Sequence, residues 1–482
     1  MTTIPHIPLL RLGKPYQSLD TVEVRDIRTN ETLAVVSQAN AGIIRRDARR
    51  ADEAFDALQA MRCDELIAIS QKAADLFLRG DLPLGSDGVM QSAEDYVRSL
   101  SATSGLPHVM VRRNMEKIHF VLANMKSIFA GLTRGLDTSA IDEGFGEQAG
   151  VPVSFFPAAK QLAAILPSNS PGVHSLWVPA IAMKIPLVLK PGSEEPWTPW
   201  RIAQAFIAAG CPPEALSFYP TNHEGSQAIL DLAGRALLFG DRKTVDRYRG
   251  DPRVEVHGPG YSKVLIGEDE IDNWEAHLDV LVRSVLDNGG RSCINASTIV
   301  VPRHADAIAE ALAQRLAAVQ PKPADDPEAK LSAFAKPAFA EAIDASIDQA
   351  LRDTTGGGAT DVTAKYRSGP RRVVVDGATY LLPTLVRCQS FEHPLANTEY
   401  LFPFASVVEV PQRDMLCTIG PSLVVTAITR DPAWQRQLLA CPHIDRLNLG
   451  PIPTSVVQWD QPHEGNLFEF LYRRRAIQMA RV

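Results

Sequence analysis

The spacing of hydrophobic and polar residues changes several times along the chain, and each change marks a different kind of element. Residues 21–38 alternate around the turn-prone Arg28-Thr29-Asn30-Glu31, which predicts two short strands. Between 39 and 129, Ala, Leu and Arg recur every three or four residues, which predicts helices. Residues 147–166 are extended again, with a strand-like run at 151–156.

Short apolar segments alternate with helical ones through the middle third of the chain. Strands are expected at 163–166, 187–189, 216–219, 236–239 and 254–257. A helix over 199–209 follows the second of these strands. This alternation is typical of a doubly wound α/β sheet.

A second α/β stretch extends from about 264 to 452. Helices are expected at 274–286 and 305–319, and strands at 297–301 and 423–428. The glycine-rich 354–358 predicts a loop. The short basic tail from 468 onward is either a solvated terminal strand or a strand at a subunit edge.

Length, charge and hydrophobicity narrow the function classes. A chain of 482 residues exceeds one hydrophobic core, so two or three domains are expected. The net charge of -7 argues against a nucleic-acid partner, because phosphate binding requires a basic surface. The apolar stretch 175–189 is interrupted by Pro179, Lys184 and Pro186, so no membrane span is expected. The first residues lack the pattern of a secretory signal.

The cysteines are scattered, at positions 63, 211, 293, 388, 417 and 441. None forms a C-x-x-C pair, which suits a cytoplasmic protein and argues against a metal site. Cys293 differs from the others because two glycines precede it, in Asn288-Gly289-Gly290-Arg291-Ser292-Cys293, between a predicted helix and a predicted strand. On such a turn a cysteine is partly exposed, and backbone N–H groups stabilise a thiolate. A structural role remains open at this point, because a free cysteine is commonly a small buried hydrophobic residue.

The Cys293 segment resembles the nucleophile turn N-x-G-Q-x-C of the aldehyde dehydrogenase superfamily. Further segments resemble signatures of that family and follow in the family's order: Leu166-Pro167-Ser168-Asn169-Ser170-Pro171, Lys190-Pro191-Gly192-Ser193, Gly210-Cys211-Pro212-Pro213, Gly377 with Pro383-Thr384-Leu385, and Glu399-Tyr400-Leu401-Phe402-Pro403. Each segment alone is weak evidence. Together, in the correct order, they extend the resemblance over almost the whole chain.

The resemblance implies a mechanism for Cys293. Its thiolate adds to an aldehyde carbonyl, and the side-chain amide of Asn169 with the N–H of Cys293 stabilises the oxyanion. Loss of a hydride to NAD or NADP then leaves a thioester on Cys293. Asn169 lies between a serine and a proline, so a role as turn former is the alternative.

The resemblance also implies cofactor residues. Lys190 follows an apolar strand, where α/β sheets bind ligands, and is expected to contact the adenosine ribose. Glu399 is expected to hydrogen-bond the nicotinamide ribose, and Gly240 and Phe402 belong to the other cofactor segments. For Lys190 and Glu399 the alternative is an exposed charged residue without a function.

The chain departs from the family pattern at the residue that activates water. The family's E-L-G-G-K contains a Glu that acts as general base, and His257 aligns with it here. A histidine is a base near neutral pH, and a packed residue at a strand end fits equally well.

Loss of this Glu is a feature of acylating relatives, in which coenzyme A accepts the acyl group. His257-Gly258-Pro259 is also similar to the F-G-P segment of acyl-CoA reductases that supply aldehyde to bacterial luciferase. Glu469 matches another carboxylate near the family's tunnel, so hydrolysis stays open.

Ser193 is a second departure, because NAD-preferring relatives have a Glu at this position. Without that carboxylate there is less repulsion of a 2′-phosphate, so NADP becomes acceptable. Glu194 and Glu195 are adjacent, and a one-residue shift of the loop restores the preference for NAD.

Phe239-Gly240-Asp241 is a third departure, since the family has T-G-S at the pyrophosphate turn. The carboxylate of Asp241 beside a diphosphate is unfavourable unless Arg242 or Lys243 compensates.

These observations predict an α/β protein in which a Rossmann-like cofactor domain (1–146 and 161–258) is combined with an α/β catalytic domain (259–455). Segments 147–160 and 456–482 resemble the family's bridging elements, a small β oligomerisation element, so a homodimer or homotetramer is expected. The expected activity is NAD(P)-dependent oxidation of a small-molecule aldehyde. The alternatives are a CoA-acylating dehydrogenase or acyl-CoA reductase acting on acyl-CoA, and a non-catalytic relative that acts as a binding protein.

Overall fold

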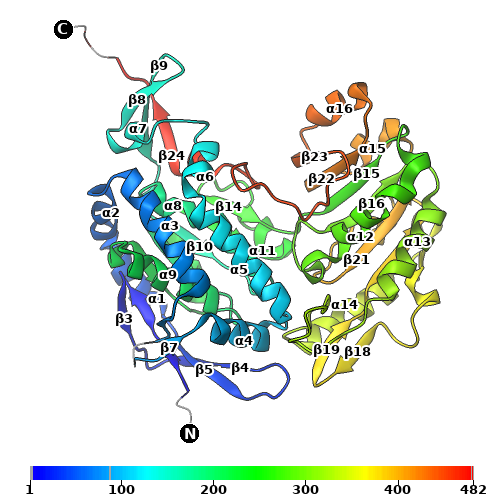
Figure 1. The fold of residues 1–482 in the computed structure, drawn as a ribbon, viewed down its shortest axis with the longest axis horizontal. Coiled ribbons are helices and arrows are strands. Elements are labelled where there is room, and N and C mark those ends of the chain that lie inside the picture. Colours follow the sequence, from blue (N-terminus) through cyan, green and yellow to red (C-terminus); the bar gives the residue numbers. More distant parts are fainter. Residues whose placement is uncertain (1–3, 86–87, 479, 481–482) are drawn as a thin grey trace. The chain divides into compact units, whose positions relative to one another are not determined.

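The computed structural model describes residues 4–85, 88–478 and 480, which form two compact units (Figure 1). The first unit contains the described residues of Met1–Thr103, Val111–Gly258 and Gln458–Val482. The second contains Ser104–Met110 and Pro259–Val457. Each unit is built around a mostly parallel sheet, which confirms the predicted α/β class. Which unit holds a cofactor and which performs chemistry stays a prediction.

The first unit has a seven-stranded sheet whose central strands were predicted from the sequence to within a few residues. Its strand order is β14 (Val254–His257), β13 (Arg235–Phe239), β10 (Leu162–Ile165), β11 (Leu187–Lys190), β12 (Leu216–Phe218), β2 (Leu9–Arg11) and β3 (Lys14–Tyr16). The strands from β14 to β12 are parallel, and β2 and β3 add an antiparallel edge. The sequence pattern did not predict this edge, because strands of three residues show no clear alternation.

Helices cover both faces of this sheet because the strand order reverses. The chain proceeds from β10 through β11 to β12 and then returns to β13 on the other side of β10. Right-handed crossovers therefore place α9 (Trp197–Ala209), before β12, and α10 (His223–Leu232), after it, on opposite faces. The carboxyl ends of β10 and β13 meet at the resulting switch point, where such sheets bind ligands.

The remaining elements of the first unit include the predicted N-terminal strands and helices. Strands β4 (Thr21–Arg25) and β5 (Thr32–Ser37) pair antiparallel, as predicted, and β1 (His6–Ile7) joins them. The helices of the region 39–129 are α1 (Ala41–Ala48), α2 (Ala51–Gln59), α3 (Cys63–Arg79), α4 (Ala93–Ser104), α5 (His108–Ala123) and α6 (Met125–Leu132). A small hairpin, β6 (Leu82–Pro83) with β7 (Met90–Gln91), interrupts this predicted helical region.

The basic tail forms a strand in a separate three-stranded sheet. Strand β24 (Tyr472–Arg475) pairs antiparallel with β9 (Val151–Pro157), which pairs with β8 (Phe145–Gln148). The expected β element of 147–160 and 456–482 is thus present within the described residues. Its role in oligomerisation stays a prediction.

The second unit also has a seven-stranded sheet, with one antiparallel strand at its edge. Its order is β17 (Ala359–Asp361), β20 (Thr384–Cys388), β21 (Phe404–Glu409), β16 (Ala296–Val301), β15 (Ser262–Ile266), β22 (Ser422–Ile428) and β23 (Ile444–Leu449). Its helices include α12 (Leu278–Leu286), α13 (Ala305–Ala317), α14 (Pro337–Ala350), α15 (Gln412–Thr418) and α16 (Pro432–Leu439). The predicted loop at 354–358 contains one short 3-10 turn, Thr355–Gly357. In the described part of the chain, every helix is too short or too polar to cross a membrane.

Candidate active site

Cys293 lies on a turn of the second unit between α12 and β16. Asn288, Gly289 and Gly290 have consecutive positive φ angles of 54°, 65° and 66°, so the chain reverses sharply after the helix. A Cβ on Gly290 would lie 2.4 Å from the carbonyl carbon of Phe402, so only glycine fits this close approach. The turn leaves Cys293 partly exposed.

Side-chain hydrogen bonds hold the turn in place. The amide of Asn288 donates to Oγ of Ser292 at 2.9 Å, and the N–H of Ser292 donates to Oδ1 of Asn295 at 3.0 Å. Asn295 is buried and donates in turn to the carbonyl oxygens of Ser284 and Asp287. The guanidinium of Arg291 donates to the carbonyl oxygen of Ser104 at 2.7 Å. These bonds fix the backbone on both sides of the thiol.

A second segment of the same unit, the bend Gly260–Ser262, contacts the cysteine backbone. The hydroxyl of Ser262 donates to the carbonyl oxygen of Cys293 at 2.8 Å. A Cβ on Gly260 would lie 2.2 Å from that same oxygen. The N–H of Tyr261 donates to Oε2 of Glu399 at 2.7 Å. The bend therefore connects two predicted site residues, Cys293 and Glu399.

The other cysteines have different surroundings. Cys63, Cys211 and Cys388 are buried, and burial raises the pKa of each thiol, to about 12 for Cys211 and Cys388. Thiolates form reluctantly at such positions. Cys417 is exposed and Cys441 half-buried, on elements that carry none of the segments that resemble the family. Among the six cysteines, Cys293 combines partial exposure with a position in one of those segments, whereas Cys211, in another of them, is buried.

Asn169 and Lys190 lie at the carboxyl ends of neighbouring strands in the first unit. Asn169 follows β10, just before a 3-10 helix (Pro171–Leu176), and Lys190 is the last residue of β11. Both are half-buried. The positions suit roles near a ligand at this edge of the sheet. Their expected oxyanion and ribose contacts stay proposals.

Ser193 and its acidic neighbours show which carboxylates are near this sheet edge. Ser193 is exposed, and its hydroxyl donates to Oε2 of Glu194 at 2.8 Å. Glu195 is buried, where it accepts hydrogen bonds from Thr198 and pairs with His174 at 3.2 Å. These contacts hold Glu195 in the interior. If the loop shifted as considered above, Glu194 would therefore be the carboxylate that faces a ribose.

Asp241 occupies the start of the helix after β13, at the switch point of the sheet. It caps α11 (Arg242–Asp246), because its carboxylate accepts from the N–H of Thr244 at 2.9 Å. Hydrogen bonds from the side chain and backbone of Thr244 hold the pKa of Asp241 below its usual range. Arg242 pairs with Asp246 at 3.6 Å, further along the same helix. Gly240 donates its N–H to the carbonyl oxygen of His257 at 3.1 Å.

The residues predicted to contact the adenosine end of a dinucleotide are chemically suited to that role. There, Lys190 and Ser193 offer an amine and a hydroxyl at a strand end. At the diphosphate position the fit is poor, because Asp241 fills the N-terminus of a five-residue helix with its own carboxylate. A diphosphate bound at the start of α11 would therefore be repelled by the Asp241 carboxylate.

His257 is the last residue of β14, and it is buried between two carboxylates. Its Nδ1–H donates to Oε2 of Glu464, and its Nε2 lies at an ion-pair distance of 3.3 Å from Oε1 of Glu255, without hydrogen-bond alignment. Its ring stacks on Phe239 with the centroids 4.4 Å apart. Burial opposes the charged form, but Glu464 and Glu255 outweigh it and raise the pKa of His257 to about 10. At neutral pH the ring is an imidazolium, which has no lone pair to take a proton from water.

A pocket of the first unit adjoins His257. Its lining comprises Leu132, Ser175, Leu176, Pro179, Leu237, Glu255, His257, Trp459, Gln461, His463, Gly465 and Leu467. Among the residues that the structure describes, no group of three or more His, Cys, Asp or Glu side chains is arranged to hold a metal ion. His257, Glu255 and Glu464 form an ion-pair cluster, and His257 and Glu255 line the pocket.

Glu469 and Phe402 occupy positions that the sequence did not reveal. Glu469 lies on α17 (Leu467–Leu471), and its exposed carboxylate pairs with Arg134 at 2.9 Å. Phe402 is buried in the hydrophobic core of the second unit, in contact with Phe404 and Tyr400. Its side chain is thus committed to packing.

Sequence reasoning missed Glu255, Glu464 and Lys263. Glu464 is separated from His257 by 207 positions, and no pattern in the sequence predicts a contact between residues so far apart. Lys263 could have been noticed in the sequence, because it is a charged residue within the otherwise apolar strand Ser-Lys-Val-Leu-Ile.

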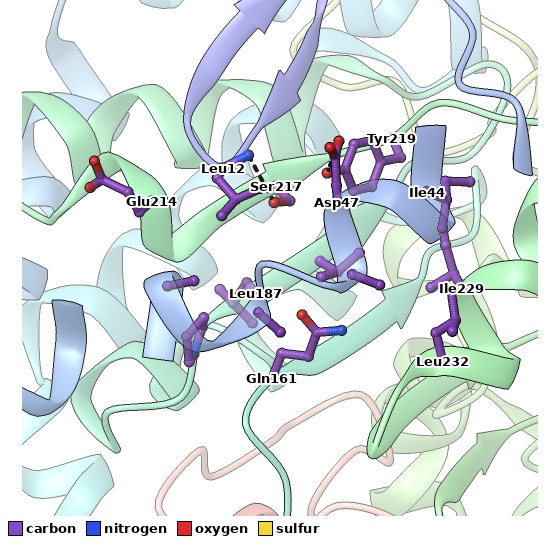
Figure 2. A pocket seen from close by; sticks show the side chains of 15 residues that line it. Leu12, Ile44, Asp47, Gln161, Leu187, Glu214, Ser217, Tyr219, Ile229 and Leu232 are labelled. Carbon is purple, nitrogen blue, oxygen red and sulfur yellow. Dashed lines mark hydrogen bonds between the residues drawn. The ribbon is translucent and has the colours of Figure 1, made fainter. Parts of the chain in front are cut away.

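A further pocket of the first unit lies at the amino ends of β11 and β12 (Figure 2). Figure 2 shows Asp47 beside Tyr219, whose hydroxyl donates to Oδ2 of Asp47 at 3.0 Å. Arg11 also pairs with Asp47, at 2.7 Å. This pocket is at the opposite ends of the strands from Lys190 and Asn169, so it is separate from the predicted cofactor site.

The two parallel α/β sheets, with the cysteine turn in the second unit, are the arrangement that the resemblance implied. The chain matches the model of the aldehyde dehydrogenase family over residues 15–419. It belongs to the aldehyde dehydrogenase family, and the expected oxidoreductase class is confirmed.

Sequence relatives and solved structures agree with this assignment. Geranial dehydrogenase from Castellaniella defragrans is 23% identical over 347 residues, which cover 68% of this chain and 67% of the relative. Malonate-semialdehyde dehydrogenase 1 from Geobacillus kaustophilus is 22% identical over 202 residues, or 40% of this chain and 41% of the relative.

The solved structures extend the likeness to nearly the whole chain. The aldehyde dehydrogenase KauB from Pseudomonas aeruginosa has a TM-score of 0.80 at 19% identity, with 98% of this chain and 96% of that chain covered. An indole-3-acetaldehyde dehydrogenase in complex with NAD+ has a TM-score of 0.80 at 18% identity and the same coverage, 98% and 96%. At these identities the likeness establishes the fold.

Proposed function

We propose that the protein oxidises an aldehyde through a thioester on Cys293, with NAD or NADP as the hydride acceptor. The observation that carries the proposal is the Cys293 turn, in which the thiol is partly exposed while its backbone is fixed by Ser262, Asn295 and the glycines. A fixed and accessible thiol is what covalent catalysis requires.

The steps follow from the residues. The Cys293 thiolate forms a C–S bond to the aldehyde carbon, and the carbonyl oxygen becomes an oxyanion. The N–H of Cys293 and the amide of Asn169 would donate to that oxyanion. Re-formation of the C=O bond expels the hydride and leaves the thioester. Lys190, Ser193 and Glu399 are the residues that would hold a dinucleotide, which would supply the hydride acceptor.

Steady-state assays with NAD and NADP test this proposal. Geranial and malonate semialdehyde, the aldehydes in the names of the relatives, are suitable probes of apolar and acidic substrates. Cys293→Ala should lower kcat at least ~1000-fold, because removing a nucleophile leaves only binding and orientation. Cys441→Ala, which removes another partly buried thiol of the same unit, should leave kcat unchanged.

Turnover that survives Cys293→Ala would contradict the role of the thiol. If the wild type binds neither dinucleotide in a calorimetric titration and shows no turnover that Cys293→Ala loses, the non-catalytic alternative holds instead.

A second candidate, transfer of the acyl group to coenzyme A, is favoured by the state of His257. The imidazolium between Glu464 and Glu255 is no base at neutral pH, and Glu469 is paired with Arg134 on the surface. With both expected water activators engaged, thioester hydrolysis should be slow. A thiol acceptor needs less activation than water, since a free thiol has a pKa of about 8.5 and ionises far more readily than water.

Pre-steady-state kinetics separate the two acceptors. With aldehyde and dinucleotide alone, we expect a burst of about one reduced dinucleotide per active site, followed by a slow steady state, because the thioester accumulates. Coenzyme A should raise the steady-state rate at least ~10-fold and leave the burst amplitude unchanged. A steady-state rate equal with and without coenzyme A would establish water as the acceptor.

A further inference from the structure

The second unit contains a buried lysine that the proposed reaction does not use. Lys263, in β15, has 0% of its surface exposed. Its Nζ donates to the carbonyl oxygen of Tyr261 at 2.6 Å and to the hydroxyl of Ser422 at 3.0 Å. Both acceptors are neutral, so the charge of the amine is not balanced within hydrogen-bond distance. Burying such a group is unfavourable, and an apolar residue would pack in the strand at lower cost.

The carbonyl group that Lys263 binds belongs to the bend Gly260–Ser262. Tyr261 has a φ of 45°, a conformation that a bulky residue adopts only when its surroundings hold it. The register of β15 against β16 also shifts between Ser262 and Lys263. Lys263 thus supports the strained residue from its carbonyl side, while Glu399 accepts its N–H from the other side.

The same bend reaches the Cys293 turn through Ser262. Its hydroxyl donates to the carbonyl oxygen of Cys293 and accepts from the N–H of Val424 at 3.2 Å. Because Gly260 is in close approach to the same cysteine carbonyl, a displacement of the bend would displace Cys293 as well.

We propose that Lys263 is a positioning residue that fixes the bend Gly260–Ser262. Through the bend it fixes the positions of both the Cys293 backbone and the Glu399 carboxylate. This inference rests on the proposed roles of Cys293 as nucleophile and Glu399 as a cofactor contact.

The protonation of Lys263 provides a readout of this role. Desolvation lowers the pKa of Lys263 to about 7, against the attraction of the Glu399 carboxylate. The titratable side chains that face the amine are Glu399 and Tyr261, whose ring centroid is 6.0 Å from Nζ. Below pH 7 the ammonium donates charge-assisted hydrogen bonds to the bend. Above pH 7 the neutral amine holds it less firmly.

Alkylation of Cys293 by iodoacetamide, followed by peptide mass spectrometry from pH 5.5 to 9.5, measures the effect without aldehyde or dinucleotide. The wild-type profile should show a step near pH 7 in addition to the ionisation of the thiol. In Lys263→Met this step should vanish, and the rate at pH 6 should change by about tenfold as the thiol shifts on its turn.

Lys184→Met is the matched control. Lys184 is also buried, but it lies in the first unit and pairs with Asp142 at 3.1 Å. This variant loses a buried amine and stability, and should keep the wild-type alkylation profile. If Lys263→Met retains the step near pH 7, or changes the profile no more than Lys184→Met does, the proposal is wrong.

Ser262→Ala keeps the test decisive if Lys263→Met does not fold. It retains the lysine and removes the hydroxyl that joins the bend to Cys293, so the step near pH 7 should vanish here too. A wild-type profile in Ser262→Ala would overturn the proposal. Failure of the proposed function is a separate result, namely turnover that persists in Cys293→Ala whatever the alkylation profile.

Discussion

At the scale of single residues, the state of His257, the residue predicted to stand where the family has its general-base Glu, is set by its two acidic neighbours. A carboxylate at this position would meet Glu255 and Glu464 in a buried cluster of like charges, which is strongly unfavourable. The imidazolium instead compensates both. His257 and Glu464 therefore depend on each other, and neither would be tolerated alone.

This dependence explains how far the site could be predicted from the sequence. The turn at Cys293 was predictable because its neighbours in the chain, Asn288 to Gly290, produce it, while the role of Cys293 as nucleophile stays a prediction. His257 was ambiguous because its state is set by Glu464, 207 positions away. Local patterns report backbone conformation, whereas a pKa depends on contacts between distant segments.

At the scale of elements, α11 carries the clearest departure in the first unit. It is short, and Asp241 supplies the hydrogen-bond acceptor that a diphosphate would otherwise provide. The sequence placed Asp241 beside the expected turn, but it did not show that the carboxylate caps the helix. The compensating role expected of Arg242 is weakened by its pairing with Asp246.

Asp241→Ser should strengthen dinucleotide binding, by about tenfold in Kd at low ionic strength. The serine hydroxyl can still cap α11, while a negative charge next to the diphosphate is removed. Isothermal titration calorimetry with NAD and NADP measures the change. Asp246→Ser, at the other end of the same helix, removes the same charge and should have a smaller effect. Equal or weaker binding by Asp241→Ser would show that the diphosphate does not lie near this turn.

At the scale of the whole molecule, the alternation of strands and helices predicted the parallel strands of the first sheet. Of the second sheet it gave only β16 and β22, and the strands β15, β17, β20, β21 and β23 were not predicted. The central strands β10 to β14 lie within a few residues of their predicted positions, because buried parallel strands are continuous apolar runs. The edge strands β2 and β3 and the hairpin β6–β7 were missed. These short elements are stabilised by the neighbours on which they pack, such as Pro213 against Gly13, and their own sequences carry little signal.

Two of the buried cationic residues, His257 and Lys263, make opposing contributions to stability as the pH changes. The folded pKa of His257, about 10, lies above its ordinary value, so its contribution is complete below pH 6.5 and is lost as the pH rises through 10. The folded pKa of Lys263, about 7, lies below its ordinary value, so its penalty is complete below pH 7 and disappears as the pH rises toward 10.5. The wild-type dependence between pH 7 and 10 should therefore be shallow.

Single variants should uncover each contribution. His257→Gln should destabilise the first unit at pH 7 by about 3–5 kcal/mol, because two partly buried carboxylates lose their buried cation, and the deficit should shrink toward pH 10. Lys263→Met removes the penalty of a buried ammonium, so any gain in the stability of the second unit over wild type should be largest below pH 7. This gain should decline as the pH rises above 7. Thermal unfolding from pH 6 to 10 measures both differences. Parallel curves for His257→Gln and wild type would mean that His257 is not held as an imidazolium, and it would then again be available as the base that activates water.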